Sequence, residues 1–239
     1  MKIFKNIAIY IFNLIDSLVH QKKIIKFIKK KNIKITNMID VGSHKGLYTD
    51  LILRNYNIKK IILFEPQVQI FKYIKKKYKK KKNIIVYNQG VSNKNSFQIL
   101  QLNYHDLTSS LSDLNQNSLY LTVKARLFGV NISRMIYKKL KIKTVKLSDI
   151  LTKNKFRKVD LLKVDTEGHE LQVLQGLEKK INKVNHILIE FHNDQIYLKY
   201  NSQKIHNYLC KNNFVLRARF KFPFTTWEDR FYSNKNENK

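Results

Sequence analysis

The sequence predicts an α/β domain built on a mostly parallel β-sheet. Between residues 35 and 220, short apolar runs that end in glycine, acidic or polar residues alternate with segments of helical periodicity. Alternation of buried strands with helices is typical of a parallel sheet covered by helices. The chain has 239 residues, enough for one sizeable core, and no linker divides it.

The expected elements follow this alternation along the chain. Helices are expected at 46–56, at 66–80 and at 168–180, where Gly176 would end the helix. Runs 214–220 and 230–233 are expected to form an antiparallel pair at one edge. The apolar runs that predict parallel strands are 38–41, 61–64, 84–87, 159–164 and 187–191.

Residues 96–147 interrupt the alternation. Runs 97–102 and 143–147 have strand character but lie outside the strand–helix rhythm, and a polar loop and a helical patch lie between them. We interpret 104–140 as an inserted segment over the carboxyl edge of the sheet, where long loops usually bind substrate.

The two ends of the chain are assigned separately from the domain at 35–233. Residues 1–34 are expected to form a helical extension packed on the domain, with an interfacial membrane helix as the alternative. Residues 234–239 are expected to be a disordered tail. No apolar run reaches the ~18 residues that a spanning helix needs. The single cysteine, Cys210, excludes a disulfide framework and suits the reducing cytoplasm.

The formal net charge of +30 has two explanations. A basic surface is typical of proteins that bind nucleic acid or anionic membranes. However, 40 of the 47 basic residues are lysine and seven are arginine, the better reader of phosphates. The chain is also rich in isoleucine, asparagine and tyrosine, whose codons, like those of lysine, are A/T-rich. The high net charge therefore has two possible origins: a compositional bias of the genome, or selection for an anionic partner.

Two features at neighbouring strand ends predict a nucleoside-containing cofactor. The first is the turn D-V-G-S-H-K-G at 40–46, which supplies glycine where a backbone turns tightly or approaches a ligand. The second is Glu65 after the next strand, where a carboxylate can accept hydrogen bonds from ribose hydroxyls. No Walker-type phosphate loop is present.

Two further pairs of polar residues mark strand ends. Lys163 and Asp165 are expected on one face of a strand, where the buried lysine needs the aspartate as its partner. Glu190 and His192 are also two residues apart and are expected on one face of the neighbouring strand. Glu167 and Glu170 are expected in the first turn of the next helix, where the helix dipole favours anions.

Several of these segments together resemble the FkbM-type S-adenosylmethionine-dependent methyltransferases. The resemblance covers roughly residues 35–220, and His192 and Glu190 end the fifth strand as in that family. His44 stands where the family usually has asparagine. The matching segments are D-V-G-S-H-K-G-L-Y-T at 40–49, F-E-P at 64–66, G-V-S at 90–92 and K-V-D-T-E-G-H-E at 163–170.

The resemblance implies a class I methyltransferase fold, with a seven-stranded sheet, helices on both faces and an antiparallel last strand. It also implies methyl transfer from S-adenosylmethionine to a hydroxyl oxygen of a sugar, glycan or natural-product intermediate. The residues that it assigns to the cofactor are Asp40, Gly42, Ser43, Gly46, Tyr48, Glu65, Pro66, Asn88 and Asp165.

The catalytic group stays open between three interpretations. An alcohol must lose its proton, and His192 has the reference pKa closest to neutrality, which makes it the best lone base. Alternatively, Asp165, Glu190 and His192 hold a divalent cation that lowers the pKa of the acceptor. Third, Asp165, Glu190 and His192 have structural roles. The candidate catalytic residues are thus Asp165, His192, Glu190 and Lys163.

Two other functions remain as alternatives. The basic surface favours an RNA-modifying methyltransferase on the same fold, and a non-catalytic relative that binds a surface is the third possibility. The prolines stand at 66 and 223, so the N-P-P-[YF] motif used on exocyclic amino groups of bases is absent. Cys210 lies too far past the fifth strand to serve as the nucleophile of base C5 methylation.

Overall fold

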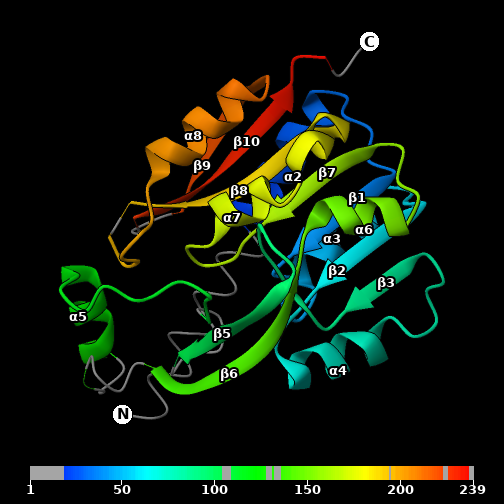
Figure 1. Cartoon of the computed structure of the whole chain (residues 1–239). Helices are drawn as coiled ribbons and strands as arrows, with labels where there is room; N and C mark the ends of the chain where they lie inside the picture. Colours follow the sequence, from blue (N-terminus) through cyan, green and yellow to red (C-terminus); the bar gives the residue numbers. More distant parts are fainter. Residues whose placement is uncertain are drawn as a thin grey trace.

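The computed structural model describes residues 19–103, 109–127, 131, 136–193, 195–222 and 226–236. A seven-stranded sheet lies between two layers of helices, and a smaller three-stranded sheet lies beside it (Figure 1). Within the described residues, no helix combines the length and the apolar character that crossing a membrane requires.

The large sheet has the order β3-β2-β1-β7-β8-β10-β9. The first five strands pair in parallel, and β10 runs antiparallel to both of its neighbours. The predicted seven-stranded, mostly parallel sheet with an antiparallel last strand is confirmed. The strands are β1 (Asn37–Val41), β2 (Lys60–Phe64), β3 (Ile84–Tyr87), β7 (Val159–Val164), β8 (Val184–His192), β9 (Phe214–Lys221) and β10 (Trp227–Asn234).

The predicted antiparallel pair at the edge of the sheet is confirmed. β9 is the edge strand, and β10 lies between β8 and β9. Phe231 and Tyr232 explain the position of β10: both are fully buried, on opposite faces of the sheet, as in a central strand. Asn234, predicted to begin the tail, instead ends β10 and donates a hydrogen bond to the Val184 carbonyl at 3.2 Å.

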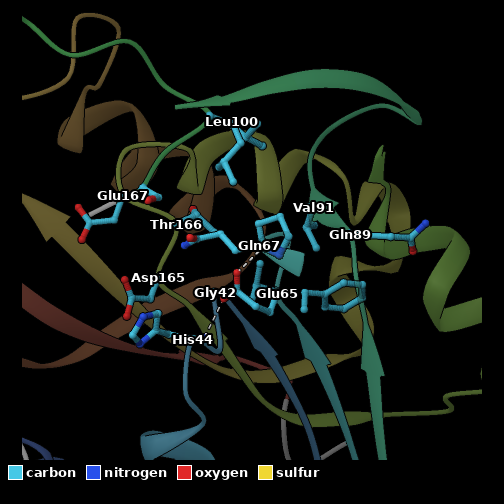
Figure 2. A pocket seen from close by; sticks show the side chains of 16 residues that line it. Gly42, His44, Glu65, Gln67, Gln89, Val91, Leu100, Asp165, Thr166 and Glu167 are labelled. Carbon is cyan, nitrogen blue, oxygen red and sulfur yellow. Dashed lines mark hydrogen bonds between the residues drawn. The ribbon is translucent and has the colours of Figure 1, made fainter. Parts of the chain in front are cut away.

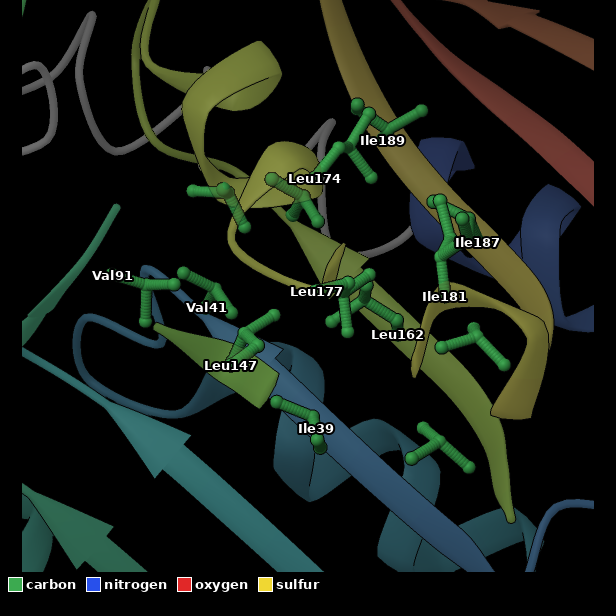
Figure 3. Packing of buried hydrophobic residues seen from close by; sticks show 14 of the residues in the cluster. Ile39, Val41, Val91, Leu147, Leu162, Leu174, Leu177, Ile181, Ile187 and Ile189 are labelled. Carbon is green, nitrogen blue, oxygen red and sulfur yellow. The ribbon is translucent and has the colours of Figure 1, made fainter. Parts of the chain in front are cut away.

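Helices cover both faces of the sheet because its strands are apolar on both sides. Ile39 and Val41 face one core, together with α6, α7, the 3-10 helix η4 and α8 (Figure 3). Met38, on the alternate face of β1, lies in the other core with α2, α3 and α4. The helices are α2 (Gln21–Lys30), α3 (Leu47–Asn55), α4 (Val68–Lys77), α6 (Leu147–Lys153), α7 (Glu170–Gln175), η4 (Glu178–Lys183) and α8 (Ser202–Lys211).

The described part of the N-terminal extension packs on the domain. Ile24, Ile25 and Ile28 of α2 are buried in the second core. Residues 1–18, which carry the rest of the expected extension and the alternative membrane helix, lie outside the described residues.

Residues 90–145 contain a second sheet, of order β4-β6-β5. Its strands are β4 (Gly90–Val91), β5 (Ser96–Asn103) and β6 (Ile136–Val145). The first half of β6 and the helix α5 (Leu119–Leu127) fall within the inserted segment 104–140. The strand predicted at 97–102 is confirmed. The strand predicted at 143–147 was wrong at both ends, because β6 begins at Ile136 and the fully buried Leu147 begins α6.

Candidate active site

A pocket opens at the carboxyl ends of β1, β2 and β7. Gly42 follows β1, Glu65 and Pro66 follow β2, and Asp165 and Glu167 follow β7 (Figure 2). Leu100 of the strand 96–103 and Ser109 and Leu111 of the inserted segment also line the pocket. In an open α/β sheet, ligands bind at this edge.

Gly42 is required by the packing of the chain on itself. Its φ is +81°, and a Cβ there would lie 1.8 Å from the backbone oxygen of Asp165. The turn after β1 therefore packs directly on the strand end that carries Asp165. Gly46 has φ +74°, and a Cβ would lie 2.5 Å from the Tyr78 hydroxyl. In both places the side-chain space is filled by protein atoms.

Glu65 is the acidic group that lines the pocket at the end of β2. Its carboxylate is buried and accepts hydrogen bonds from the backbone N–H of His44 at 3.1 Å and of Gln67 at 2.8 Å (Figure 2). Burial raises the pKa of Glu65 to about 7, and these two hydrogen bonds oppose the rise. The side-chain amide of Asn88 stabilises the turn at Glu65 and Pro66, because it donates hydrogen bonds to both of their carbonyls at 3.0 Å each.

Five of the nine predicted cofactor residues do not line the pocket: Asp40, Ser43, Gly46, Tyr48 and Asn88. Asp40 is fully buried and accepts a hydrogen bond from the Thr49 hydroxyl at 2.8 Å. The Ser43 hydroxyl donates to the Phe64 carbonyl at 3.3 Å. The ring of Tyr48 lies under the ammonium of Lys163, 5.5 Å from it. The contacts of Asp40 and Ser43 stabilise the 40–46 turn.

Lys163 joins two strand ends electrostatically. Its Nζ lies 2.8 Å from Oδ2 of Asp165 and 3.9 Å from Oδ1 of Asp40. Burial alone would lower the pKa of Lys163, but the two carboxylates outweigh burial and raise it. Burial likewise opposes ionisation of Asp165, yet the Lys163 ammonium holds the pKa of Asp165 below its usual value. The predicted pairing of Lys163 with Asp165 is confirmed.

Glu190 and His192 lie on one face of β8, as predicted. Oε2 of Glu190 is 3.4 Å from Nε2 of His192. Burial, followed by the charges of Asp165 and Glu167, raises the pKa of Glu190 well above its usual value. Neither Glu190 nor His192 is among the residues that line the pocket, whereas Glu167, whose Oε2 lies 3.9 Å from Nε2 of His192, does line it.

Glu167 is the site residue that the sequence analysis did not select. It precedes α7, in a turn with φ +53°, and its Oε2 lies 3.9 Å from Nε2 of His192. Its carboxylate also accepts a hydrogen bond from the hydroxyl of Tyr197. The helix-dipole interpretation of Glu167 was wrong, because α7 begins only at Glu170. Its place two residues after Asp165, at a strand end, was the available signal.

Glu170 has a structural role. It is fully buried, and its Oε1 accepts hydrogen bonds at 3.1 Å from the backbone N–H groups of Thr166 and Gly168 and from the Thr166 hydroxyl. These contacts fix the turn that carries Glu167. Gly176 directly follows α7, as the sequence predicts.

The inserted segment is attached to the same turn. The Ser110 hydroxyl donates to the Glu167 carbonyl, and the Ser112 hydroxyl donates to the Gly168 carbonyl at 2.8 Å. Leu114 pairs with Tyr197 in an isolated β-bridge. The described part of the insertion therefore covers the carboxyl edge, at the position expected of a substrate loop. Residues 104–108, 128–130 and 132–135 of the insertion lie outside the described residues.

The chain is similar to known methyltransferases in sequence and in structure. A hexuronic acid methyltransferase, AglP of Haloferax volcanii, is 37% identical over 51 residues, which are 21% of this chain and 21% of that protein. The structure is similar to that of an FkbM methyltransferase from Methylobacillus flagellatus, with TM-score 0.51 and 16% identity, over 83% of this chain and 43% of that one.

A second solved structure has the same similarity score. It is a Streptococcus pneumoniae protein provisionally assigned as a tRNA methyltransferase, with TM-score 0.51 and 11% identity, over 89% of this chain and 69% of that one. At these identities, the likeness to both structures establishes a shared fold. The chain thus spans 21% of AglP and 43% of the Methylobacillus flagellatus protein.

The strand ends described above fall within one matched region. Residues 40–216 match the methyltransferase FkbM domain, a range that runs from Asp40 on β1 into β9. This match covers more than half of the sequence, and the chain belongs to the FkbM methyltransferase family.

Proposed function

We propose that the protein binds S-adenosylmethionine in this pocket and transfers its methyl group to an acceptor. The observation that carries the proposal is the buried carboxylate of Glu65, which faces the cavity at the carboxyl end of β2. Each carboxylate oxygen has accepted one backbone N–H and keeps a further lone pair for a ribose hydroxyl. The Gly42 turn and Asp165 form the neighbouring wall.

The pocket wall contributes alignment to the reaction: a methyl–oxygen bond forms as the methyl–sulfur bond breaks, and the proton that the acceptor hydroxyl loses would pass to water. The bound cofactor would supply an activated methyl group on a sulfonium. Asp165, held by Lys163, lies at the cavity wall, where it would orient the acceptor hydroxyl against the methyl donor. Its lowered pKa makes Asp165 a weak base, so we assign it to positioning.

For the acceptor, we propose a hydroxyl of a sugar, glycan or natural-product intermediate. The similarity of a 51-residue segment to a hexuronic acid methyltransferase supports a sugar. The insertion that closes over the pocket through Ser110 and Ser112 supports a small acceptor enclosed beside the cofactor.

The net charge of +30 favours a second candidate, an RNA acceptor. Two measurements separate the candidates. Binding of S-adenosylmethionine and of its demethylated product is measured by calorimetry on the wild type and on Glu65→Gln. Cell extract is then fractionated into glycans, small metabolites and RNA, and each fraction is incubated with methyl-labelled cofactor.

We expect micromolar binding that is weakened in Glu65→Gln, and label in the glycan or metabolite fraction. Label confined to RNA would replace the sugar acceptor with the second candidate. Absence of binding by the folded wild type would overturn the cofactor assignment.

A further inference from the structure

We propose that Glu167, Glu190 and His192 form a binding site for one first-row divalent cation beside the pocket. We call these three residues the carboxylate–imidazole cluster. Each offers one ligand atom, and the three atoms lie within 4.8 Å of one another. The cluster differs from the set that the sequence analysis considered, because Glu167 replaces Asp165, whose carboxylate is paired with Lys163.

The spacing of the ligand atoms suits such an ion. A divalent cation lies about 2.0–2.2 Å from carboxylate and imidazole ligands, which places adjacent ligand atoms roughly 3.0–3.5 Å apart. Nε2 of His192 lies 3.4 Å from Oε2 of Glu190, within that range, and 3.9 Å from Oε2 of Glu167. A small rotation of the Glu167 side chain would complete three ligands.

A separate observation indicates that a ligand is needed here. The His192 side chain is only 5% exposed, yet its Nε2 has no hydrogen-bond partner, and neither does Oε2 of Glu190. Leaving a buried polar atom unsatisfied is costly, and such atoms are rare in folded proteins. The two atoms lie 3.4 Å apart, so one cation would satisfy both.

The surroundings hold the cluster in place. The rings of Tyr197 and Tyr200 pack edge-on against His192, at centroid distances of 5.1 and 5.4 Å. The Tyr197 hydroxyl donates to Glu167, and the Tyr200 hydroxyl accepts the backbone N–H of His192. Outer contacts of this kind orient the ligands of metal sites.

The ligand types narrow the choice of ion. Two carboxylates and one imidazole suit Mn²⁺ or Zn²⁺ better than Mg²⁺, which prefers oxygen ligands throughout. Glu167 also lines the pocket, so the ion would lie within reach of the acceptor. If the proposed function holds, the ion would lower the pKa of the acceptor hydroxyl and ease removal of its proton.

The test measures Mn²⁺ binding directly, without cofactor or turnover. The full chain is stripped with chelator, and binding is followed by calorimetry and by electron paramagnetic resonance. The variants are Glu190→Gln and Glu167→Gln, which keep side-chain size, and the matched control is Glu178→Gln. Glu178 is exposed and pairs with Lys146 outside the cluster. Circular dichroism confirms that each variant is folded.

We expect one Mn²⁺ per chain, at least tenfold weaker binding in both cluster variants, and wild-type binding in Glu178→Gln. A magnetic coupling to imidazole nitrogen should be present in the wild type and lost in His192→Gln. No binding by the wild type, or equal binding by Glu190→Gln, would overturn the site. The cofactor titration is separate, so failure of the proposed function would leave this result unchanged.

Discussion

Lys163 and Asp165, two residues apart at the end of β7, form an ion pair of 2.8 Å between Nζ and Oδ2. The same ammonium lies 3.9 Å from the fully buried carboxylate of Asp40 on the adjacent strand β1. The ion pair thus holds the carboxylate of Asp165 at the cavity wall. Its ammonium also compensates the charge of the buried Asp40 carboxylate.

The first prediction concerns this ion pair. Lys163→Met should lower the free energy of unfolding by about 3–5 kcal/mol, because two carboxylates lose their cation in a mostly buried place. Urea denaturation at neutral pH measures the loss. Lys179→Met, at an exposed position, is the control and should change stability by less than about 0.5 kcal/mol. Equal stability of the two variants would show that Lys163 does not compensate these carboxylates.

The second prediction concerns Gly42. Gly42→Ala should destabilise the fold by more than about 2 kcal/mol, since a left-handed φ costs a non-glycine residue about 1–2 kcal/mol before the contact with the Asp165 carbonyl is added. Gly90→Ala is the matched control, because its nearest contact is the flexible end of Ile142 and its φ is not positive. Thermal denaturation should rank Gly42→Ala well below Gly90→Ala, and the reverse order would contradict the packing argument.

The third prediction is a pH dependence of stability that Glu65 causes. Burial raises its pKa from 4.5 to about 7, so the folded protein keeps a proton there that the unfolded chain has lost. The resulting stability is full below pH 4.5 and is lost as the pH rises through 7. Glu65→Gln should remove this loss and gain about 2–3 kcal/mol over the wild type at pH 8. If the free energy of unfolding had the same pH dependence in the wild type and in Glu65→Gln, Glu65 would not be the cause of the loss.

The fourth prediction follows from the same group. Ribose hydroxyls would donate to the ionised carboxylate, so wild-type affinity for S-adenosylmethionine should rise as the pH passes through 7. In Glu65→Gln the affinity should be lower and nearly flat over this range. Calorimetry at several pH values tests both statements, and a flat wild-type profile would remove Glu65 from the cofactor contacts.

The fifth prediction concerns the lysine-rich surface. If its charge is compositional, single-stranded RNA of any sequence should bind weakly and lose affinity steeply between low and physiological salt, as counterion release requires. Fluorescence anisotropy on two unrelated RNA sequences measures this. A complex with one defined RNA that survives physiological salt would favour the RNA acceptor instead.

The parallel strands could be predicted because each is an apolar run: β1, β2, β7 and β8 are mostly buried on both faces, and β3, at the edge of the sheet, is half-buried. Ile84–Tyr87 and Val159–Val164 match the predicted bounds residue for residue. The first half of β6 was missed because exposed lysines dominate it, including Lys138, Lys139 and Lys141, and such a pattern gives no burial signal.

The part of the candidate site that depends on the spacing of residues within one strand could be predicted. Pairs two residues apart on one strand, such as Glu190 and His192, follow from alternation alone. Glu167 was missed because its position depends on a left-handed turn and on Tyr197, 30 residues further along the chain. The pairing of Gly42 with the Asp165 carbonyl is also a tertiary contact, which glycine in a turn does not reveal.

The insertion of β10 between β8 and β9 has a consequence for the order of folding. β9 reaches the large sheet only through β10, so β8 and β9 cannot be joined before β10 is in place. The two C-terminal strands are neighbours in sequence and pair antiparallel, which makes their contact a low-separation one that forms early. They should dock on β8 as one preformed ribbon. Amide hydrogens of β9 and β10 should therefore exchange together, as one cooperative opening unit that is separable from β1, β2 and β7.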